Sequence, residues 1–208
     1  MVNIKEMPAK EKYDNIAAAI RLTSYVDGFI EKNLGSQALA EYQEESQKGV
    51  KPIPENASDE EKYEIIYSNF MWMGATLFSF VRKRMGEDGL NQLIRTDVEE
   101  LKRANASPAM WLVKLIKAVA PGTAFTMMAK KIAYNLQWTT PFTVPELSRN
   151  RMVMDVPHCK VLDYPGADDI CVIACQKIYG LWFAEQFGLE LKAERKESSC
   201  IMTVSPLK

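Results

Sequence analysis

The sequence holds few side chains of the kinds that act as nucleophiles or bind soft metals. It has a single histidine, His158, and four cysteines, and neither residue type occurs before position 158. The preceding part of the chain therefore offers no thiol nucleophile, no imidazole base, and no thiolate or imidazole ligand for a metal. The GxSxG, HExxH, P-loop and GxGxxG patterns are missing as well, so no common hydrolase, zinc-protease or nucleotide-binding motif is indicated.

The sequence also has no excess of positive or negative charge. The 26 basic and 27 acidic residues give a formal net charge of -1, so no electrostatic footprint for nucleic acid or an anionic membrane is present. No apolar stretch of the signal-peptide kind opens the sequence, and the apolar-looking stretch NFMWMGATLFSFV is interrupted by polar residues and too short to span a bilayer. We therefore expect a cytoplasmic protein whose cysteines are buried fillers, metal ligands or reactive thiols rather than disulfides.

Helical signals occupy the first two thirds of the chain. Apolar residues near a 3.6-residue period form segments that are separated by glycine and proline breaks. Ser58 and Glu61 form the sequence signature of a capping box at one helix start. Helices are predicted over 9–34, 36–47, 58–85 and 88–105, then at MWLVKLIKAV after a Ser107-Pro108 start and at FTMMAKKIAYNL after Pro121-Gly122, with a loop at GVKPIPENAS.

The composition changes near Trp138. Partly alternating β-branched and apolar residues predict strands at WTTPFTV and RMVMDV, a helix over 169–187, and two further strands at LELKAERK and CIMTV. This order predicts an antiparallel sheet with the helix packed on one face. The fold class expected is α+β, with a helical region over 1–137 followed by a β-β-α-β-β module over 138–208 that contains the cysteines and binds a ligand.

The cysteines are not scattered over the sequence. All four lie between position 159 and the last residue, and random placement would put them there with a probability of about 0.003. Two interpretations remain open. A compact apolar subdomain can use cysteine as a small hydrophobic residue, or the thiols can form a functional site.

Cys171 and Cys175 illustrate both interpretations. They are four residues apart on the predicted helix and so share one face, which Tyr179 and its apolar neighbours continue as a buried stripe would. If Asp168 caps the helix, Cys171 lies in its first turn, where free N–H groups and the helix dipole lower the pKa of a thiol. The charges of Asp168 and Asp169 would oppose that shift.

The remaining two cysteines lie at strand ends. Cys159 ends the second predicted strand and Cys200 opens the last, so a helix packed across the sheet brings its start close to both. The set Cys159, Cys171, Cys175 and Cys200 would suit structural zinc or an iron–sulfur cluster, although the spacing lacks a CxxC knuckle. His158 adjoins Cys159 on a strand and is therefore expected to face the opposite side.

Four short stretches give this module a family resemblance. VPHC (156–159), DDIC (168–171), LELKAERK (189–196) and SSCIMTV (198–204) resemble the L-2-amino-thiazoline-4-carboxylic acid hydrolase-like family, which is related in architecture to 4-vinyl reductase-type small-molecule-binding domains. The resemblance implies an α+β ligand-binding fold with Cys159, Cys171 and Cys200 around a pocket. It also implies hydrolytic opening of a cyclic, sulfur-containing amino acid derivative.

Two classes of function follow. In the first, the chain is a small-molecule hydrolase in which Cys159, Cys171 and Cys200 are catalytic and His158 and Arg195 bind the substrate, with a thiolate attacking an amidine-like carbon. In the second, it is a non-catalytic accessory protein that binds a small molecule, a tetrapyrrole, zinc or an iron–sulfur cluster. The expected partner is a small-molecule ligand, with a homodimer or an accessory role to another protein as further expectations.

Overall fold

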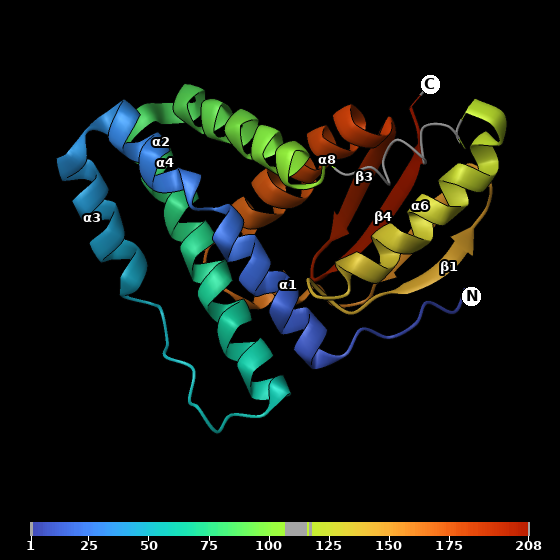
Figure 1. Cartoon of the computed structure of the whole chain (residues 1–208), viewed down its shortest axis with the longest axis horizontal. Helices are drawn as coiled ribbons and strands as arrows, with labels where there is room; N and C mark the ends of the chain where they lie inside the picture. Colours follow the sequence, from blue (N-terminus) through green and yellow to red (C-terminus); the bar gives the residue numbers. More distant parts are fainter. Residues whose placement is uncertain (1, 107–115, 117, 208) are drawn as a thin grey trace.

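The computed structural model describes residues 2–106, 116 and 118–207. A helical part built from the first hundred residues lies beside a four-stranded sheet (Figure 1). The N-terminal segment runs back to the sheet, where the backbone N–H of Val2 donates to the carbonyl of Val144 at 2.8 Å. The helix predicted at MWLVKLIKAV and its Ser107-Pro108 start lie outside the described residues, apart from single positions at the end of that stretch.

The N-terminal helices largely follow the sequence signals. The predicted capping box is confirmed, because the Glu61 N–H donates to Ser58 Oγ at 3.2 Å and the Ser58 N–H donates to Glu61 Oε2 at 2.8 Å. Gly86 (φ +67°) turns the long fourth helix at the junction between the two segments predicted there. The helices are α1 (Ala9–Leu22), α2 (Tyr25–Leu34), α3 (Ser36–Gln47), α4 (Asp59–Ala104) and α6 (Pro121–Leu136).

The continuous helix predicted over 9–34 is wrong, because the chain breaks between α1 and α2. The hydroxyl of Thr23 donates to the carbonyl of Ile20 at 2.7 Å, and the Thr23 N–H bonds the same carbonyl at 3.1 Å. A threonine side chain that binds the preceding turn offers the backbone an alternative to the helical ladder. The apolar period continues across this break, so the periodicity alone did not reveal it.

The C-terminal sheet confirms the predicted α+β class. Its strands are β1 (Thr143–Leu147), β2 (Met152–Val156), β3 (Leu189–Lys196) and β4 (Ser199–Pro206), and they are antiparallel in the order β1-β2-β4-β3. Met154 pairs with Met202, which in turn pairs with Ala193, so these three share one face. That inner face carries most of the buried residues of the sheet, and the helices pack against it.

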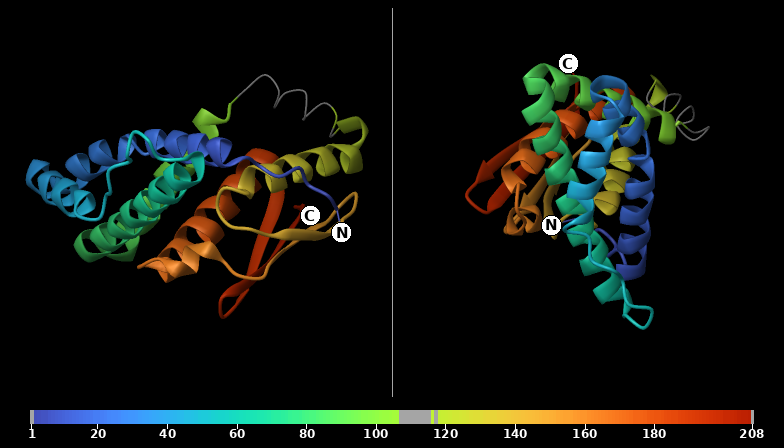
Figure 2. Two further views of the ribbon diagram at one scale, coloured as in Figure 1. Left: turned by 90° about the horizontal axis from the view of Figure 1, so that it is seen from below. Right: turned by 90° about the vertical axis from the view of Figure 1, so that its left-hand side faces the viewer.

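Two helical segments cover the inner face. One is α6, and the other is formed by residues 167–187, here called the cysteine helix (Figure 2). The cysteine helix departs from the α-helix predicted there, because much of it is π-helical, with hydrogen bonds from residue i to residue i+5. Its parts are α7 (Ala167–Asp169), η2 (Ile170–Ile178, π-helical), α8 (Tyr179–Trp182) and η3 (Phe183–Phe187, π-helical).

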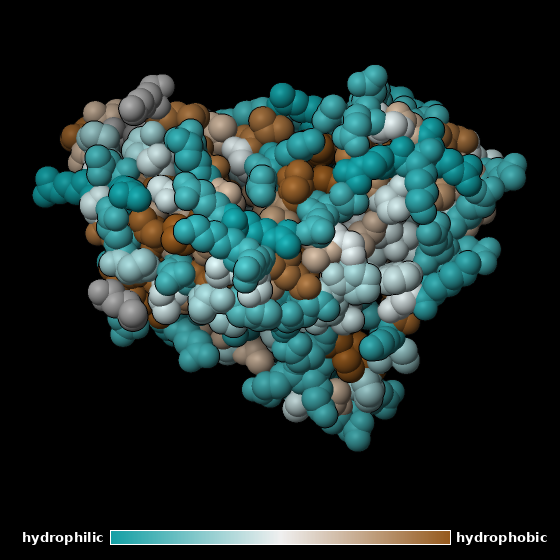
Figure 3. All heavy atoms as spheres, turned by 180° about the vertical axis from the view of Figure 1, so that it is seen from behind, coloured by the Kyte–Doolittle hydropathy of each residue, from teal (hydrophilic) through white to brown (hydrophobic). Residues whose placement is uncertain are grey.

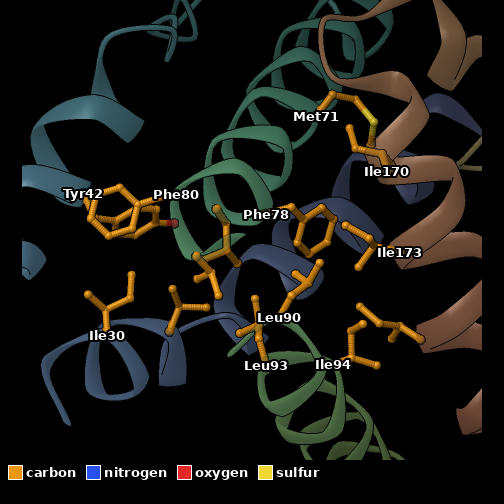
Figure 4. Packing of buried hydrophobic residues seen from close by; sticks show 14 of the residues in the cluster. Ile30, Tyr42, Met71, Phe78, Phe80, Leu90, Leu93, Ile94, Ile170 and Ile173 are labelled. Carbon is orange, nitrogen blue, oxygen red and sulfur yellow. The ribbon is translucent and has the colours of Figure 1, made fainter. Parts of the chain in front are cut away.

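The cysteine helix joins two hydrophobic clusters. On one side Ile170 and Ile173 pack into the core of the helical part, near Met71 and Phe78 of α4 (Figure 4). On its other side Phe183 packs among residues of α6 and the sheet. The helix is therefore buried on opposite sides, which explains the high apolar content of its sequence.

On the face seen in Figure 3, hydrophobic atoms form separate areas between hydrophilic ones. Within the described ranges, no helix combines the length and apolarity needed to cross a bilayer.

Gly166, which precedes the cysteine helix, sets how closely this helix approaches α4. Its φ is +75°, and a Cβ there would lie 2.6 Å from the Cβ of Ala75. We expect Gly166→Ala to lower the free energy of unfolding by about 2 kcal/mol or more, because backbone strain and overpacking add. Denaturant titration measures this loss. In the control Gly28→Ala no atom lies within 4 Å of the new Cβ, and a gain of up to about 1 kcal/mol is expected; equal effects of the two variants would contradict the close approach.

Candidate functional site

A cavity of about 50 Å³ lies between the cysteine helix and the inner face of the sheet. The Thr139–Thr140 segment after α6 and residues 159–162 after β2 close its other sides. Its lining is mainly apolar, with polar groups from cysteine, threonine, tyrosine and arginine side chains. The volume admits a few water molecules or a small ligand group, since one water needs about 10–15 Å³.

All four cysteines line this cavity, as free thiols. Cys159 was expected to end the second strand, but β2 ends at Val156, and Cys159 lies three residues further on, directly before the 3₁₀ turn η1 (Lys160–Asp163). Cys200 lies on β4 opposite Val156. Cys171 and Cys175 come from the π-helical segment η2. Side chains from three separate parts of the C-terminal module therefore meet, as the predicted packing of helix on sheet requires.

The π-helical turns align a row of side chains with the cavity. Cys171, Cys175, Tyr179 and Phe183 all line it although each is four residues from the next. In an α-helix every such step rotates a side chain by about 40° beyond a full turn, so the row would drift away from the cavity. The wider π turns rotate less per residue and offset this drift. Residues four apart consequently stay on one side of the cysteine helix.

Burial dominates the electrostatics of three thiols. It raises the pKa of Cys175 to about 12 and that of Cys200 to about 11, and it also raises the pKa of Cys159. Repulsion between neighbouring thiolates adds to each rise. Hydrogen-bonding groups near Cys159, including the Thr140 hydroxyl, partly offset the rise in its pKa. The Arg195 guanidinium partly offsets the rise in the pKa of Cys200. Near neutral pH these three side chains are uncharged thiols.

All four cysteines keep partial exposure, and Cys171 differs from the others in its polar neighbours, Gln176 and Arg195. The amide of Gln176 donates to its Sγ at 3.8 Å. The guanidinium of Arg195 pairs with Asp168 and also interacts with the Cys171 sulfur, and both interactions raise the pKa of Arg195. The Nε of Arg195 donates to the carbonyl of Glu197 at 2.9 Å, which holds the side chain beside the cavity. A cation is thus available to any negative charge formed on this sulfur.

Cys171 was expected in the first turn of the cysteine helix but lies beyond it. Gly166, not Asp168, precedes the first helical residue, and no side chain caps the helix. Cys171 is therefore beyond the first turn, where the helix dipole acts less strongly. The two acidic residues near it are paired, Asp168 with Arg195 and Asp169 with Arg82 at 2.6 Å. The negative charges of Asp168 and Asp169, which were expected to disfavour a thiolate at Cys171, are therefore partly compensated by these guanidinium groups.

His158 does not line the cavity, so its predicted role in binding substrate has no geometric support there. Its side chain is 57% exposed, and its Nε2 lies 2.8 Å from a carboxylate oxygen of Asp163. Its carbonyl accepts a hydrogen bond from the Thr140 hydroxyl at 3.2 Å. His158 and Cys159 both lie beyond the end of β2 at Val156, so the strand alternation on which their opposite orientation was expected does not apply to them.

The four thiols are not arranged as a metal-ligand set. In the described part of the chain, no three histidine, cysteine, aspartate or glutamate side chains are placed to hold a metal ion. The zinc or iron–sulfur interpretation of Cys159, Cys171, Cys175 and Cys200 therefore gains no support from the geometry.

Three polar residues of the lining, Thr139, Thr140 and Tyr179, were missed by sequence reasoning as site residues. Thr140 accepts a hydrogen bond from the Lys160 N–H at 2.9 Å and so joins the two segments that close the cavity. Tyr179 is partly buried near Cys175, and burial raises the pKa of its hydroxyl. The four-residue spacing between Cys175 and Tyr179 could have placed Tyr179 in the site, but Tyr179 was interpreted as part of a buried apolar stripe.

Comparisons with protein families, curated proteins and solved structures found no match for this chain.

Proposed function

We propose that this chain binds a small molecule at the cysteine-lined cavity, with one group of the ligand inside among the thiols and the rest held outside by Arg195, whose side chain is 36% exposed. The observation that supports this proposal is the convergence of four thiols and one guanidinium on a single, mainly apolar cavity. Apolar walls with a few polar groups that point inward are typical of small-molecule sites. Arg195 favours a ligand with a carboxylate, and the soft thiols favour one that contains sulfur. A tetrapyrrole is much larger than a cavity of about 50 Å³.

A second candidate is hydrolysis of a cyclic, thiazoline-type amino acid derivative. The observation that favours it is the contact of Arg195 with the partly exposed Cys171. In this reaction Cys171 Sγ attacks the amidine carbon, the bond from that carbon to the ring sulfur breaks, and the sulfur leaves as a thiol after taking a proton. Water then displaces Cys171 and releases a urea-type product. Cys159, Cys175 and Cys200 serve as uncharged thiols in the cavity wall, because their raised pKa values keep them protonated.

The test combines calorimetric binding of 2-amino-thiazoline-4-carboxylate with an assay for the thiol that ring opening releases. We expect the wild type to bind this compound and Cys171→Ser and Arg195→Gln each to weaken binding at least tenfold. Val172→Ala is the matched control, because Val172 adjoins Cys171 on the same helical turn but is 42% exposed. Circular dichroism verifies that each variant is folded.

The two candidates give different results. Binding without thiol release supports a binding protein, whereas catalytic thiol release that Cys171→Ser abolishes supports the hydrolase. If neither binding nor release occurs, or if Val172→Ala has the same effect as Cys171→Ser, both candidates are wrong.

A further inference from the structure

A second cavity lies in the helical part of the molecule. It has a volume of about 140 Å³ and is enclosed by residues of α1, α2, α3, α4 and the cysteine helix. Most of its wall is apolar, and aromatic rings contribute much of it, among them Tyr42 and Phe78, which lie in the part of the core drawn in Figure 4. A dry cavity of about 150 Å³ holds one benzene molecule in other proteins, so this one suits a ligand of about that size.

The polar end of this cavity is acidic. Asp97 and Glu100 of α4 line it, and the lining residues within the described part of the chain include no lysine, arginine or histidine. Glu100 has a cationic partner in Arg103, at 2.7 Å. The Asp97 carboxylate has no such partner among the described residues and receives a single hydrogen bond, from the hydroxyl of Tyr25 to Oδ1.

The second oxygen of Asp97 is open to a ligand. No described residue donates a hydrogen bond to Oδ2. If Oδ2 were fully buried, it would be a buried side-chain oxygen without a partner, and the described residues contain no such oxygen. Oδ2 is therefore accessible, and Asp97 is among the residues that line the cavity. Burial raises the pKa of Asp97 to about 7, as expected for a carboxylate whose charge has no compensating cation.

We propose that this cavity binds a small hydrophobic ammonium ion, with its apolar body among the aromatic rings and its charged nitrogen on Asp97. An ammonium group supplies both the hydrogen bond and the positive charge that Oδ2 does not receive from the described residues. Aromatic faces attract cations further, and Tyr25, Tyr42 and Tyr179 provide them. A carboxylate ligand would be repelled by Asp97 and Glu100, and a neutral apolar ligand would leave the half-buried Asp97 carboxylate without a compensating cation. This site is separate from the cysteine-lined cavity and does not rest on the function proposed for it.

The test is calorimetric titration of the full chain with benzylamine, benzyl alcohol and benzoate at pH 8. We expect benzylamine to bind, benzyl alcohol to bind at least tenfold more weakly, and benzoate not to bind. Asp97→Asn, which keeps the shape and removes the charge, should weaken benzylamine binding at least tenfold. Glu99→Gln is the matched control, because Glu99 is an exposed carboxylate on the same helix and outside the cavity.

A second variant fills the cavity without changing its charge. Gly74 lies in α4 and lines the cavity, and a Cβ added to it would have no atom within 4 Å. Gly74→Leu should therefore abolish benzylamine binding while the helix gains propensity and the fold survives. If benzylamine fails to bind the wild type, or if it binds Asp97→Asn or Gly74→Leu as well as the wild type, the proposal is wrong.

The pH dependence gives an independent readout. Benzylamine stays protonated between pH 6 and pH 8, whereas Asp97 ionises in this range, so affinity should rise by about tenfold as pH increases. The other ionisable groups that face Asp97 are Glu100 on its own helix and Tyr25, Tyr42 and Tyr179 from α2, α3 and the cysteine helix. The pKa of Tyr42 is about 12, and burial also raises that of Tyr179. An affinity that does not change over this range would contradict the role of Asp97.

Discussion

Tyr67→Ala is expected to lower the free energy of unfolding by about 3–5 kcal/mol, the usual cost of removing a buried aromatic ring. Tyr67 is fully buried in the core of the helical part, at 0% exposure. Its ring contacts the rings of Tyr63 and Tyr164, and the Nζ of Lys160 lies 4.5 Å from its centroid. Because small domains are stable by only about 5–15 kcal/mol, this variant is expected to unfold at a much lower denaturant concentration.

The hydroxyl of Tyr67 also supports the cysteine-lined cavity. It donates to the carbonyl of Thr139 at 2.5 Å, and Thr139 is part of the cavity lining. Tyr67→Phe separates the two contributions, because it keeps the ring and should cost about 1–3 kcal/mol for the carbonyl left without its donor. Urea denaturation followed by fluorescence measures both variants.

Tyr134 provides the matched control for this experiment. Its hydroxyl also forms a hydrogen bond, to Glu11 at 2.6 Å, but its ring is only partly buried. We expect Tyr134→Ala to cost about 1 kcal/mol. A loss for Tyr67→Ala no greater than for Tyr134→Ala would show that Tyr67 does not anchor the core as described.

Cys175 is expected to react with a thiolate-specific reagent about a thousandfold more slowly in the folded protein than in the unfolded chain at pH 8. Burial raises its pKa to about 12, whereas an exposed cysteine has a pKa of about 8.5. Ionisation alone then lowers the thiolate fraction by about three orders of magnitude, and restricted access slows the reaction further. Iodoacetamide labelling followed by peptide mass spectrometry measures the rate at each cysteine.

Cys171 is the matched control within the same labelling experiment, because it lies on the same helix and is likewise partly exposed, but has the Arg195 guanidinium beside its sulfur. It should be labelled first in the folded protein. The folded state holds the proton of Cys175 more tightly, so the stability that this group contributes is complete below about pH 8.5 and is lost as pH rises towards 12. After denaturation without reductant, four thiols should react. Fewer than four, or equal labelling of Cys171 and Cys175 in the folded state, would contradict this account.

Much of the fold was determined by local signals. The capping box at Ser58, the helix segments on either side of Gly86 and the alternating strands after Gly188 all follow the predicted boundaries closely. These features rest on hydrogen bonds and side-chain periods that act over a few residues, which a sequence displays directly. The break at Thr23 was missed because a hydroxyl can bind the preceding turn or point outward, and the apolar period does not distinguish the two.

The cysteine-lined cavity was partly predictable from the same kind of reasoning. The order of strands and helix placed Cys159, Cys171 and Cys200 near one another, and all three line the cavity. The π-helical turns that keep Cys171 and Cys175 in line with Tyr179 were not predictable, since α- and π-helical segments share the same residue types.

The second cavity was decided by tertiary structure alone. In the sequence Asp97 is one of many acidic residues on a long helix and is expected to be solvated. Its burial and its bond to Tyr25, 72 residues away in the sequence, exist only because α2, α4 and the cysteine helix pack together. The sequence by itself thus determined where helices and strands form and that the thiols share one module. The desolvation of particular charged groups, such as Asp97, depended on contacts between distant segments, and so did the set of side chains that lines each cavity. Desolvation is a property of the packed molecule and not of any short stretch of chain.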